Sequence, residues 1–172
     1  GMTSAQKKWL GDLTQQVNRY PSPPGSTYRM TLKGGRGNDG KWGLYCSHTA
    51  LAYLLTGERK YYDKAMELLR YTAGMYSIIH QNNKIPSMRN HVRLGVLSAY
   101  DWLYNTMPED ERKSIGKTLF PPLKAFYEHW RNTGYMRNVP INLYTDTVMG
   151  WYLGLVFLDA GVEGADEQVC TQ

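Results

Sequence analysis

The stretch Leu94–Arg112, LGVLSAYDWLYNTMPEDER, decides the fold that this sequence predicts. Its apolar residues recur at the three- and four-residue spacing of one helical face, and more of them fill most of the other positions. A helix that is apolar nearly all round belongs inside a domain. Pro108 is a favourable first helical residue, and the acidic residues after it suit the positive end of a new helix. The stretch therefore predicts a buried helix that turns tightly into an exposed one, an αα-hairpin.

The same helical spacing recurs through the rest of the chain. It predicts further helices over residues 3–20, 42–55, 60–80, 108–131 and 142–160. The helix over 108–131 is expected to break or kink at Pro121 and Pro122. The near-continuous apolar character of the inner helices predicts which residues are mostly buried. These are Leu97, Tyr100, Trp102, Trp151 and Leu155.

Similar short segments recur about 50 residues apart. Ala52–Leu55, Ala99–Trp102 and Leu155–Leu158 each close an apolar helix, and an amphipathic helix follows the first two. Repeated helix hairpins build solenoids or closed toroids. The predicted fold class is therefore all-α, an incomplete (α/α) toroid built of repeated helix hairpins. Residues 1–172 form a single helical domain, with an N-terminal helix and long loop over 1–41, hairpins over 42–161 and a polar tail over 162–172.

The formal net charge of +5 fits an anionic partner, and solubility alone explains it equally well. A nucleic-acid-binding helical repeat would carry a basic stripe along its helices, whereas here the basic residues concentrate in loops and at helix starts. We therefore expect no nucleic acid as a partner. No stretch is long and apolar enough to span a membrane, so we expect no membrane partner, and no signal peptide is recognisable.

The sequence offers no metal or cofactor site. Cys46 and Cys170 are too few for a disulfide framework, and Cys46 lies in an apolar helical stretch that predicts a buried thiol. His48, His80 and His129 show no metal-ligand spacing. We expect neither a metal ion nor a cofactor.

The hairpin repeat predicts where a binding site lies. Inner helices that run parallel begin at one end of the domain, which we call the rim. Helix starts offer unpaired N–H groups and about half a positive charge each. Together with basic residues in the adjoining loops, they would form an anion-binding face. Those residues are Arg36, Lys41, Arg89, Arg93 and Arg137.

Two segments also resemble a known family. AYDWLY followed by MPEDERKSI, and the run ALAYLLTGERKYYDKAMELL, are similar to the helix hairpins of heparinase II/III-like polysaccharide lyases. The resemblance covers most of residues 42–161. It implies part of an N-terminal helical (α/α) toroid domain that acts by β-elimination on an acidic, uronic-acid-containing polysaccharide. It also implies a periplasmic or secreted protein.

The resemblance implies site residues as well. In the family an Asn begins an inner helix that contains a G-x-x-x-G run, which Asn142, Gly150 and Gly154 match, although Leu143 replaces the usual Trp or His. β-Elimination needs a neutralised carboxylate and an acid and base, typically Tyr or His. The implied catalytic residues are Asn142, Tyr144 and His91. The predicted substrate-binding residues are those expected at or near the rim: Arg93, Arg137, Arg36, Trp42 and Asn90.

Other interpretations of these residues remain open. Asn142 fits a helix N-cap equally well, and His91 could be a base, a sugar contact or a cap. The alternative function is a non-catalytic carbohydrate-binding or protein-interaction module on the same scaffold. A closed toroid needs more hairpins than this sequence supplies. The open edge would expose apolar residues, which predicts either a homodimer or poor solubility.

Overall fold

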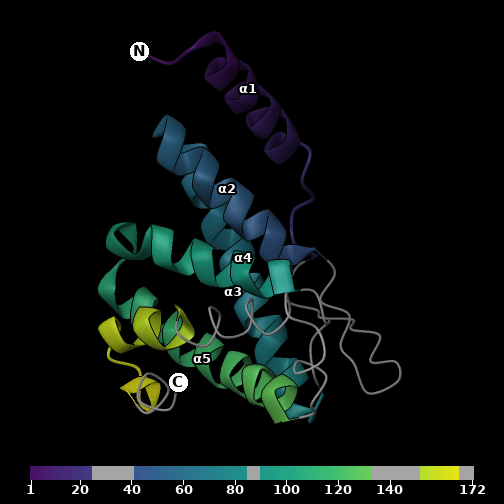
Figure 1. Cartoon of the computed structure of the whole chain (residues 1–172), viewed down its shortest axis with the longest axis vertical. Helices are drawn as coiled ribbons and strands as arrows, with labels where there is room; N and C mark the ends of the chain where they lie inside the picture. The colour runs from purple at the N-terminus through teal and green to yellow at the C-terminus, as the bar shows by residue number, and fades with distance from the viewer. Residues whose placement is uncertain (25–40, 85–89, 133–151, 167–172) are drawn as a thin grey trace.

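The computed structural model of the protein describes residues 1–24, 41–84, 90–132 and 152–166 (Figure 1), apart from the side chains of residues 90–93, 130 and 131. Helix accounts for 82% of the described residues, and none of them lies in a strand. The predicted all-α class is confirmed. The helices are α1 (Ser4–Asn18), α2 (Trp42–Thr56), α3 (Arg59–Gln81), α4 (Asn90–Leu103), the 3-10 helix η1 (Tyr104–Thr106) and α5 (Glu109–Asn132). Residues 152–159 are also helical.

Local sequence determines how the helices end and begin. The α2 helix stops at Gly57, whose φ of 69° is left-handed and whose N–H donates to the Tyr53 carbonyl at 2.8 Å. Glycine adopts this conformation without strain and often ends helices in this way. At the other hairpin, Pro108 directly precedes α5, whose first turn carries three acidic residues, as the sequence predicts.

The α5 helix is continuous through Pro121 and Pro122, so the predicted break is wrong, and the alternative of a kink stays a prediction. Two prolines remove two backbone N–H donors, which normally disrupts a helix. Here Phe120 and Leu123 are buried on either side of the pair, and α5 packs along α3. We attribute the continuity to that packing.

The α2 and α3 helices, which follow each other in the chain, pack against each other. The α2 helix packs on α4, and α3 packs on α5. Figure 1 shows α2 and α4 running in the same direction, and their beginnings meet where Gly43 lies against Gly95. The Tyr62 hydroxyl of α3 donates to the Thr106 carbonyl of η1 at 3.1 Å, and Arg70 of α3 forms an ion pair with Glu111 of α5. The beginnings of α2 and α4 therefore lie together in the described part of the chain.

The core confirms some burial predictions and corrects others. Leu97 and Tyr100 are fully buried, as predicted. Trp102 is 37% exposed and Leu155 is 53% exposed, so those two predictions are wrong. Both lie on a face that no described helix covers. Trp151 lies outside the described residues.

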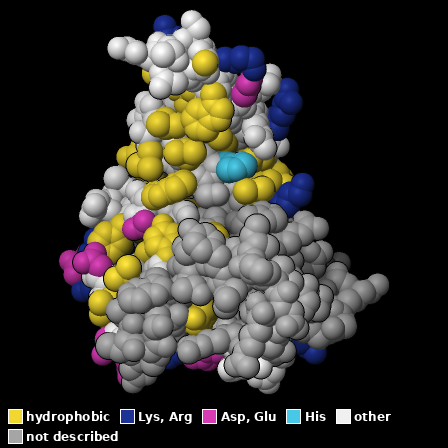
Figure 2. Space-filling model, in the orientation of Figure 1, with side chains coloured by type: hydrophobic (Ala, Val, Ile, Leu, Met, Phe, Trp, Pro, Cys, Tyr) yellow, Lys and Arg dark blue, Asp and Glu magenta, His cyan; other side chains and the backbone are white. Residues whose placement is uncertain are grey.

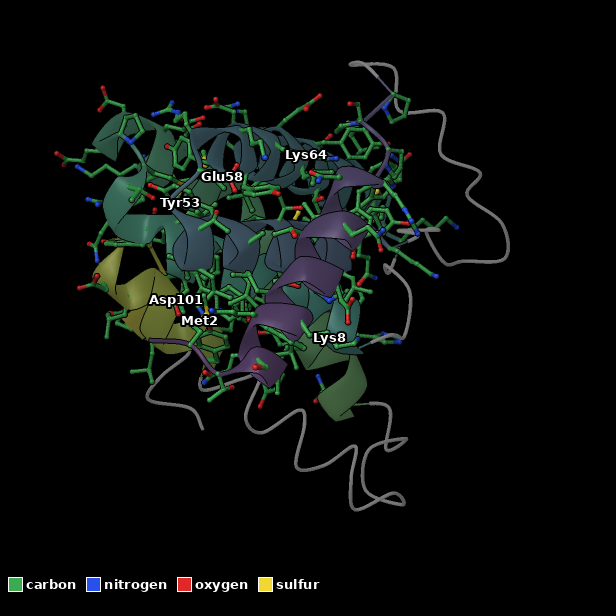
Figure 3. The ribbon with its side chains drawn as sticks, turned by 90° about the horizontal axis from the view of Figure 1, so that it is seen from above. Met2, Lys8, Tyr53, Glu58, Lys64 and Asp101 are labelled. Atoms are coloured by element: carbon green, nitrogen blue, oxygen red, sulfur yellow. The ribbon has the colours of Figure 1, made fainter. Side chains whose placement is uncertain are left out.

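The α1 helix is attached to the hairpins mainly through its C-terminal half. Leu13 and Val17 form a small buried cluster with Ala52 and Tyr61. The Lys64 ammonium of α3 donates to the carbonyl oxygens of Val17 and Tyr20, each at 2.9 Å. Figure 3 shows Lys64 beside this end of α1. Lysine here caps the negative end of a helix.

The described ranges contain no helix with both the length and the apolar character that a membrane crossing requires. Cys46 is fully buried, as predicted, and its burial raises the pKa of the thiol to about 12. Cys170 lies outside the described residues.

Candidate functional site

The sequence-predicted site residues fall into three groups. Trp42 is fully described and is the first residue of α2. Asn90, His91 and Arg93 lie in the first turn of α4, and their side chains are outside the described part. The residues wholly outside the described ranges are Arg36, Arg137, Asn142 and Tyr144.

The close contact between α2 and α4 brings two of these groups to the rim. An added Cβ at Gly95 would lie only 2.4 Å from the Gly43 carbonyl oxygen, so the two backbones nearly touch. Gly43 follows Trp42 directly, and Gly95 is two residues beyond Arg93. The backbone of residues 90–93 therefore begins near Trp42 at the same end of the domain.

Around Trp42 the structure gathers a set of half-buried rings that we call the aromatic cluster: Tyr20, Trp42, Tyr45, His48 and Tyr71. The ring centroids of Trp42 lie 4.8 Å from Tyr71 and 5.7 Å from Tyr45. Those of Tyr20 and Tyr45 are 4.2 Å apart. Contacts at these distances stabilise aromatic pairs beyond the effect of buried area.

Three different elements build the aromatic cluster. Trp42, Tyr45 and His48 follow one another at intervals of three residues, which keeps them on adjoining positions of one side of α2. Tyr71 comes from the antiparallel helix α3. Tyr20 comes from the segment after α1, which Lys64 holds against α3.

A hydrogen bond joins Tyr20 and His48 within the aromatic cluster, between the tyrosine hydroxyl oxygen and Nδ1 of the imidazole. Burial lowers the pKa of His48 from its ordinary value of 6.5. Burial, with a smaller contribution from Tyr45, raises the pKa of Tyr20 to about 12. At neutral pH both groups are therefore uncharged, and the tautomer of the imidazole decides which of the two donates the hydrogen bond. Such a pair can pass a proton and can hydrogen-bond a hydroxyl group.

A cavity of about 360 Å³ lies at the C-terminal end of α4, and unlike the aromatic cluster it contains carboxylates. Its lining includes Asp101 and Asp159. The Tyr152 hydroxyl donates to Asp101 Oδ2 at 2.7 Å, and the Tyr104 hydroxyl donates to the Asp159 carbonyl at 3.0 Å. Asp101 is exposed, so it accepts this hydrogen bond without needing it to offset burial. Two carboxylates in its lining make this hollow unsuited to an anionic ligand.

Sequence reasoning missed four members of the aromatic cluster. The three-residue spacing of Trp42, Tyr45 and His48 was a usable signal, because it places three rings along one side of a helix. Tyr71 and Tyr20 carry no comparable signal, since their positions depend on how α3 and α1 pack.

The described residues contain no group of three or more His, Cys, Asp and Glu side chains that could hold a metal ion. The chain matches no family model, no curated protein and no solved structure. The rim and the aromatic cluster are therefore the features from which a function can be inferred.

The lowered pKa of His48 predicts that acidification destabilises the fold. Because the folded-state pKa is below 6.5, the unfolded chain binds a proton more readily. The stability contributed by neutral His48 is thus present above pH 6.5, the ordinary pKa, and is lost as pH falls through the folded-state pKa. Urea unfolding between about pH 8 and pH 5 should show this loss, and His48→Gln should reduce it. Equal pH dependence in both proteins would contradict the assignment.

Proposed function

We propose that this chain is a polysaccharide lyase-type helical domain that binds an acidic, uronic-acid-containing polysaccharide at the rim. The observation that carries the proposal is the aromatic cluster, which lies directly at the start of α2 and beside the start of α4. Trp and Tyr combine a large apolar face with a polar edge, which suits a sugar ring. The half-buried state of these rings leaves part of their surface accessible to a ligand.

Helix starts and basic residues supply the hydrogen-bond donors and positive charge that an acidic sugar needs. The unpaired N–H groups at the beginnings of α2 and α4 attract anions. Arg93 lies in the first turn of α4, and arginine binds carboxylate and sulfate groups in a two-pronged geometry. We include Arg36, Arg137 and Asn90 among the proposed binding residues, on the basis of their positions in or next to the segments that lead into inner helices.

For the reaction we propose β-elimination. Asn142 would neutralise the uronate carboxylate, and Tyr144 and His91 would act as acid and base, as the family resemblance implies. The two hairpins would form part of a helical toroid, and the protein would act in the periplasm or outside the cell. Asn142→Ala should then abolish turnover while the protein stays folded.

One observation favours the alternative of a binding or interaction module. Trp9, Leu54 and Leu55 are each about half exposed, and Figure 2 shows hydrophobic side chains gathered over α1 and α2. Exposed apolar patches often mark protein contacts. A homodimer formed through this face would fit the predicted open edge of the repeat. Light scattering at tens of micromolar tests it, and a monodisperse monomer would count against it.

The decisive experiment separates binding from turnover. The chain is incubated with a panel of acidic polysaccharides, and ultraviolet absorbance follows the unsaturated uronate that β-elimination creates. Calorimetry on oligosaccharides of the same panel measures binding. Turnover would support the lyase, and binding without turnover would support the non-catalytic module. A chain that shows no binding and no turnover with any of these polysaccharides would contradict the proposal.

Trp42→Ala should weaken oligosaccharide binding roughly tenfold, equivalent to about 1.4 kcal/mol. The expected cause is the loss of the largest ring in the aromatic cluster. Trp9→Ala is the matched control, because Trp9 is an exposed tryptophan on α1 outside that cluster. Circular dichroism checks that both variants remain helical. Equal effects of the two substitutions would remove the aromatic cluster from the binding site.

A further inference from the structure

The cavity of about 360 Å³ at the C-terminal end of α4, which we call the acidic cavity, lies between two helices. Asp101 comes from α4, and Leu155, Val156 and Asp159 come from the helix over residues 152–159. Among the described residues that line it, two are aspartates and none is Lys, Arg or His. The acidic cavity therefore suits a positively charged group.

Exposed apolar side chains flank the acidic cavity. Trp102 follows Asp101 directly and is partly exposed, and Leu155 and Leu158 are each about half exposed. Leu155 and Leu158 are three residues apart, so they occupy adjoining positions on one side of their helix. Apolar surface of this kind around a pocket often marks a protein contact. A partner that fits here offers a large apolar side chain together with positive charge.

The first half of α1 has this combination of residues. Residues 4–10 include Lys7, Lys8 and Trp9 and contain no Asp or Glu. Both lysines are exposed. Lys8 pairs with Asp12 at 2.7 Å on the surface of α1, and such exposed pairs contribute little stability, so Lys8 can change partner at small cost.

Trp9 is left exposed because the apolar stripe of α1 is longer than the surface on which it docks. Trp9 lies four residues before Leu13 and therefore on the same side of the helix. Leu13 and Val17 belong to the buried cluster that attaches α1, whereas Trp9 is about half exposed. An exposed tryptophan at such a position is a favourable anchor for a protein contact.

The acidic cavity and the first half of α1 are complementary in chemistry. The apolar body of an indole can contact Leu155 and Val156, and its N–H can donate to a carboxylate. Lys8, next to Trp9, brings a cation for the second carboxylate. The volume is sufficient for the ring, since a cavity of roughly 150 Å³ holds benzene.

The two surfaces of one chain are far apart. Figure 1 shows α1 at one end of the longest axis and the helix over residues 152–159 toward the other end. While α1 stays docked on α2 and α3, it can reach an acidic cavity only in another copy of the chain. A contact between two different surfaces of identical chains repeats from copy to copy until a ring closes.

We propose that the first half of α1 of one copy docks in the acidic cavity of a second copy, with Trp9 against Leu155 and Lys8 beside the carboxylates. Charge complementarity selects this occupant, because the docking segment carries two lysines and no acid. This assembly differs from a homodimer through the face of α1 and α2, which would not involve Asp101 or Asp159. It does not depend on the proposed polysaccharide ligand.

Sedimentation velocity of the full chain at tens of micromolar tests the contact. The wild type should form species larger than a monomer. Trp9→Ala removes the docked ring, and the double variant Asp101→Asn, Asp159→Asn removes both carboxylate charges. Each should raise the concentration needed for association about tenfold or more. An equimolar mixture of the two variants should form a 1:1 complex and nothing larger, because it combines one intact α1 with one intact acidic cavity.

The matched control is the double variant Asp63→Asn, Glu67→Gln, which removes two negative charges from exposed positions of α3 outside the cavity. It should associate like the wild type, and circular dichroism checks that every variant stays helical. An equal loss in this control would attribute the effect to net charge and overturn the proposal.

Three further results would also overturn it: a monomeric wild type, association that survives loss of both carboxylates, or a mixture of the two variants that stays monomeric. The proposed function is judged separately, because oligosaccharide binding is measured with Trp42→Ala and is expected to be unchanged in Trp9→Ala.

Discussion

Gly95→Ala is expected to destabilise the protein by about 3 kcal/mol or more, at the upper end of what overpacking costs. The new Cβ would lie 2.4 Å from the Gly43 carbonyl oxygen and 2.8 Å from its carbonyl carbon. Both are backbone atoms, so no side chain can turn aside to make room. The contact could be relieved only by separating α2 from α4, which would disrupt the core between them and the rim.

The control for this variant is Gly11→Ala. Gly11 lies in the middle of α1, and an added Cβ there would meet nothing within 4 Å. Because alanine favours helix over glycine, this substitution should stabilise the chain by about 0.5–1 kcal/mol. Urea unfolding measures both changes. A Gly95→Ala protein as stable as the wild type would show that the two helices are not in such close contact.

Tyr100→Ala should cost about 3–5 kcal/mol, as expected for removing a large buried aromatic side chain. Tyr100 is fully buried, and its ring centroid lies 5.1 Å from that of Phe157. Its hydroxyl donates to the Arg112 carbonyl at 3.0 Å. One side chain therefore joins α4, α5 and the helix over residues 152–159. Tyr100→Phe keeps the ring and should cost only about 1 kcal/mol, through the lost hydrogen bond.

Trp102→Ala provides the comparison, although tryptophan is the larger residue. Trp102 is 37% exposed, so its removal leaves a smaller cavity, and the expected cost is about 1 kcal/mol. Thermal or urea unfolding of the three variants would test the difference. Trp102→Ala would contradict the described packing of α4 if it proved as destabilising as Tyr100→Ala.

The contrast between Tyr100 and Trp102 also shows how far the sequence could predict this fold. Helical spacing located α1, α2, α3 and α5 to within two residues of their ends, because it reflects a repeating local geometry. In a helix that is apolar nearly all round, the same spacing does not say which side meets a neighbour. Trp102 and Leu155 were therefore expected to be buried. The continuity of α5 at Pro121 and Pro122 likewise depends on packing against α3, which local rules omit.

The candidate site, too, could be predicted from the sequence only in part. The idea that inner helices begin at one end needs only a hairpin repeat, and the meeting of Gly43 with Gly95 agrees with it for α2 and α4. Trp42 was identified from the sequence as a residue of that end. The pairing of Tyr20 with His48 was not predictable, because it joins residues 28 positions apart through the way α1 docks.

The attachment of α1 through Lys64 makes the aromatic cluster sensitive to local opening. Tyr20 stays beside His48 only while this end of α1 is docked, and that docking buries little more than Leu13 and Val17. Segments with few buried contacts open without global unfolding, and their amide hydrogens exchange faster than those of the core. A ligand that contacts Tyr20 binds only the docked form, so it must favour that form. Saturating ligand should therefore slow hydrogen exchange along α1, including turns that the ligand never touches.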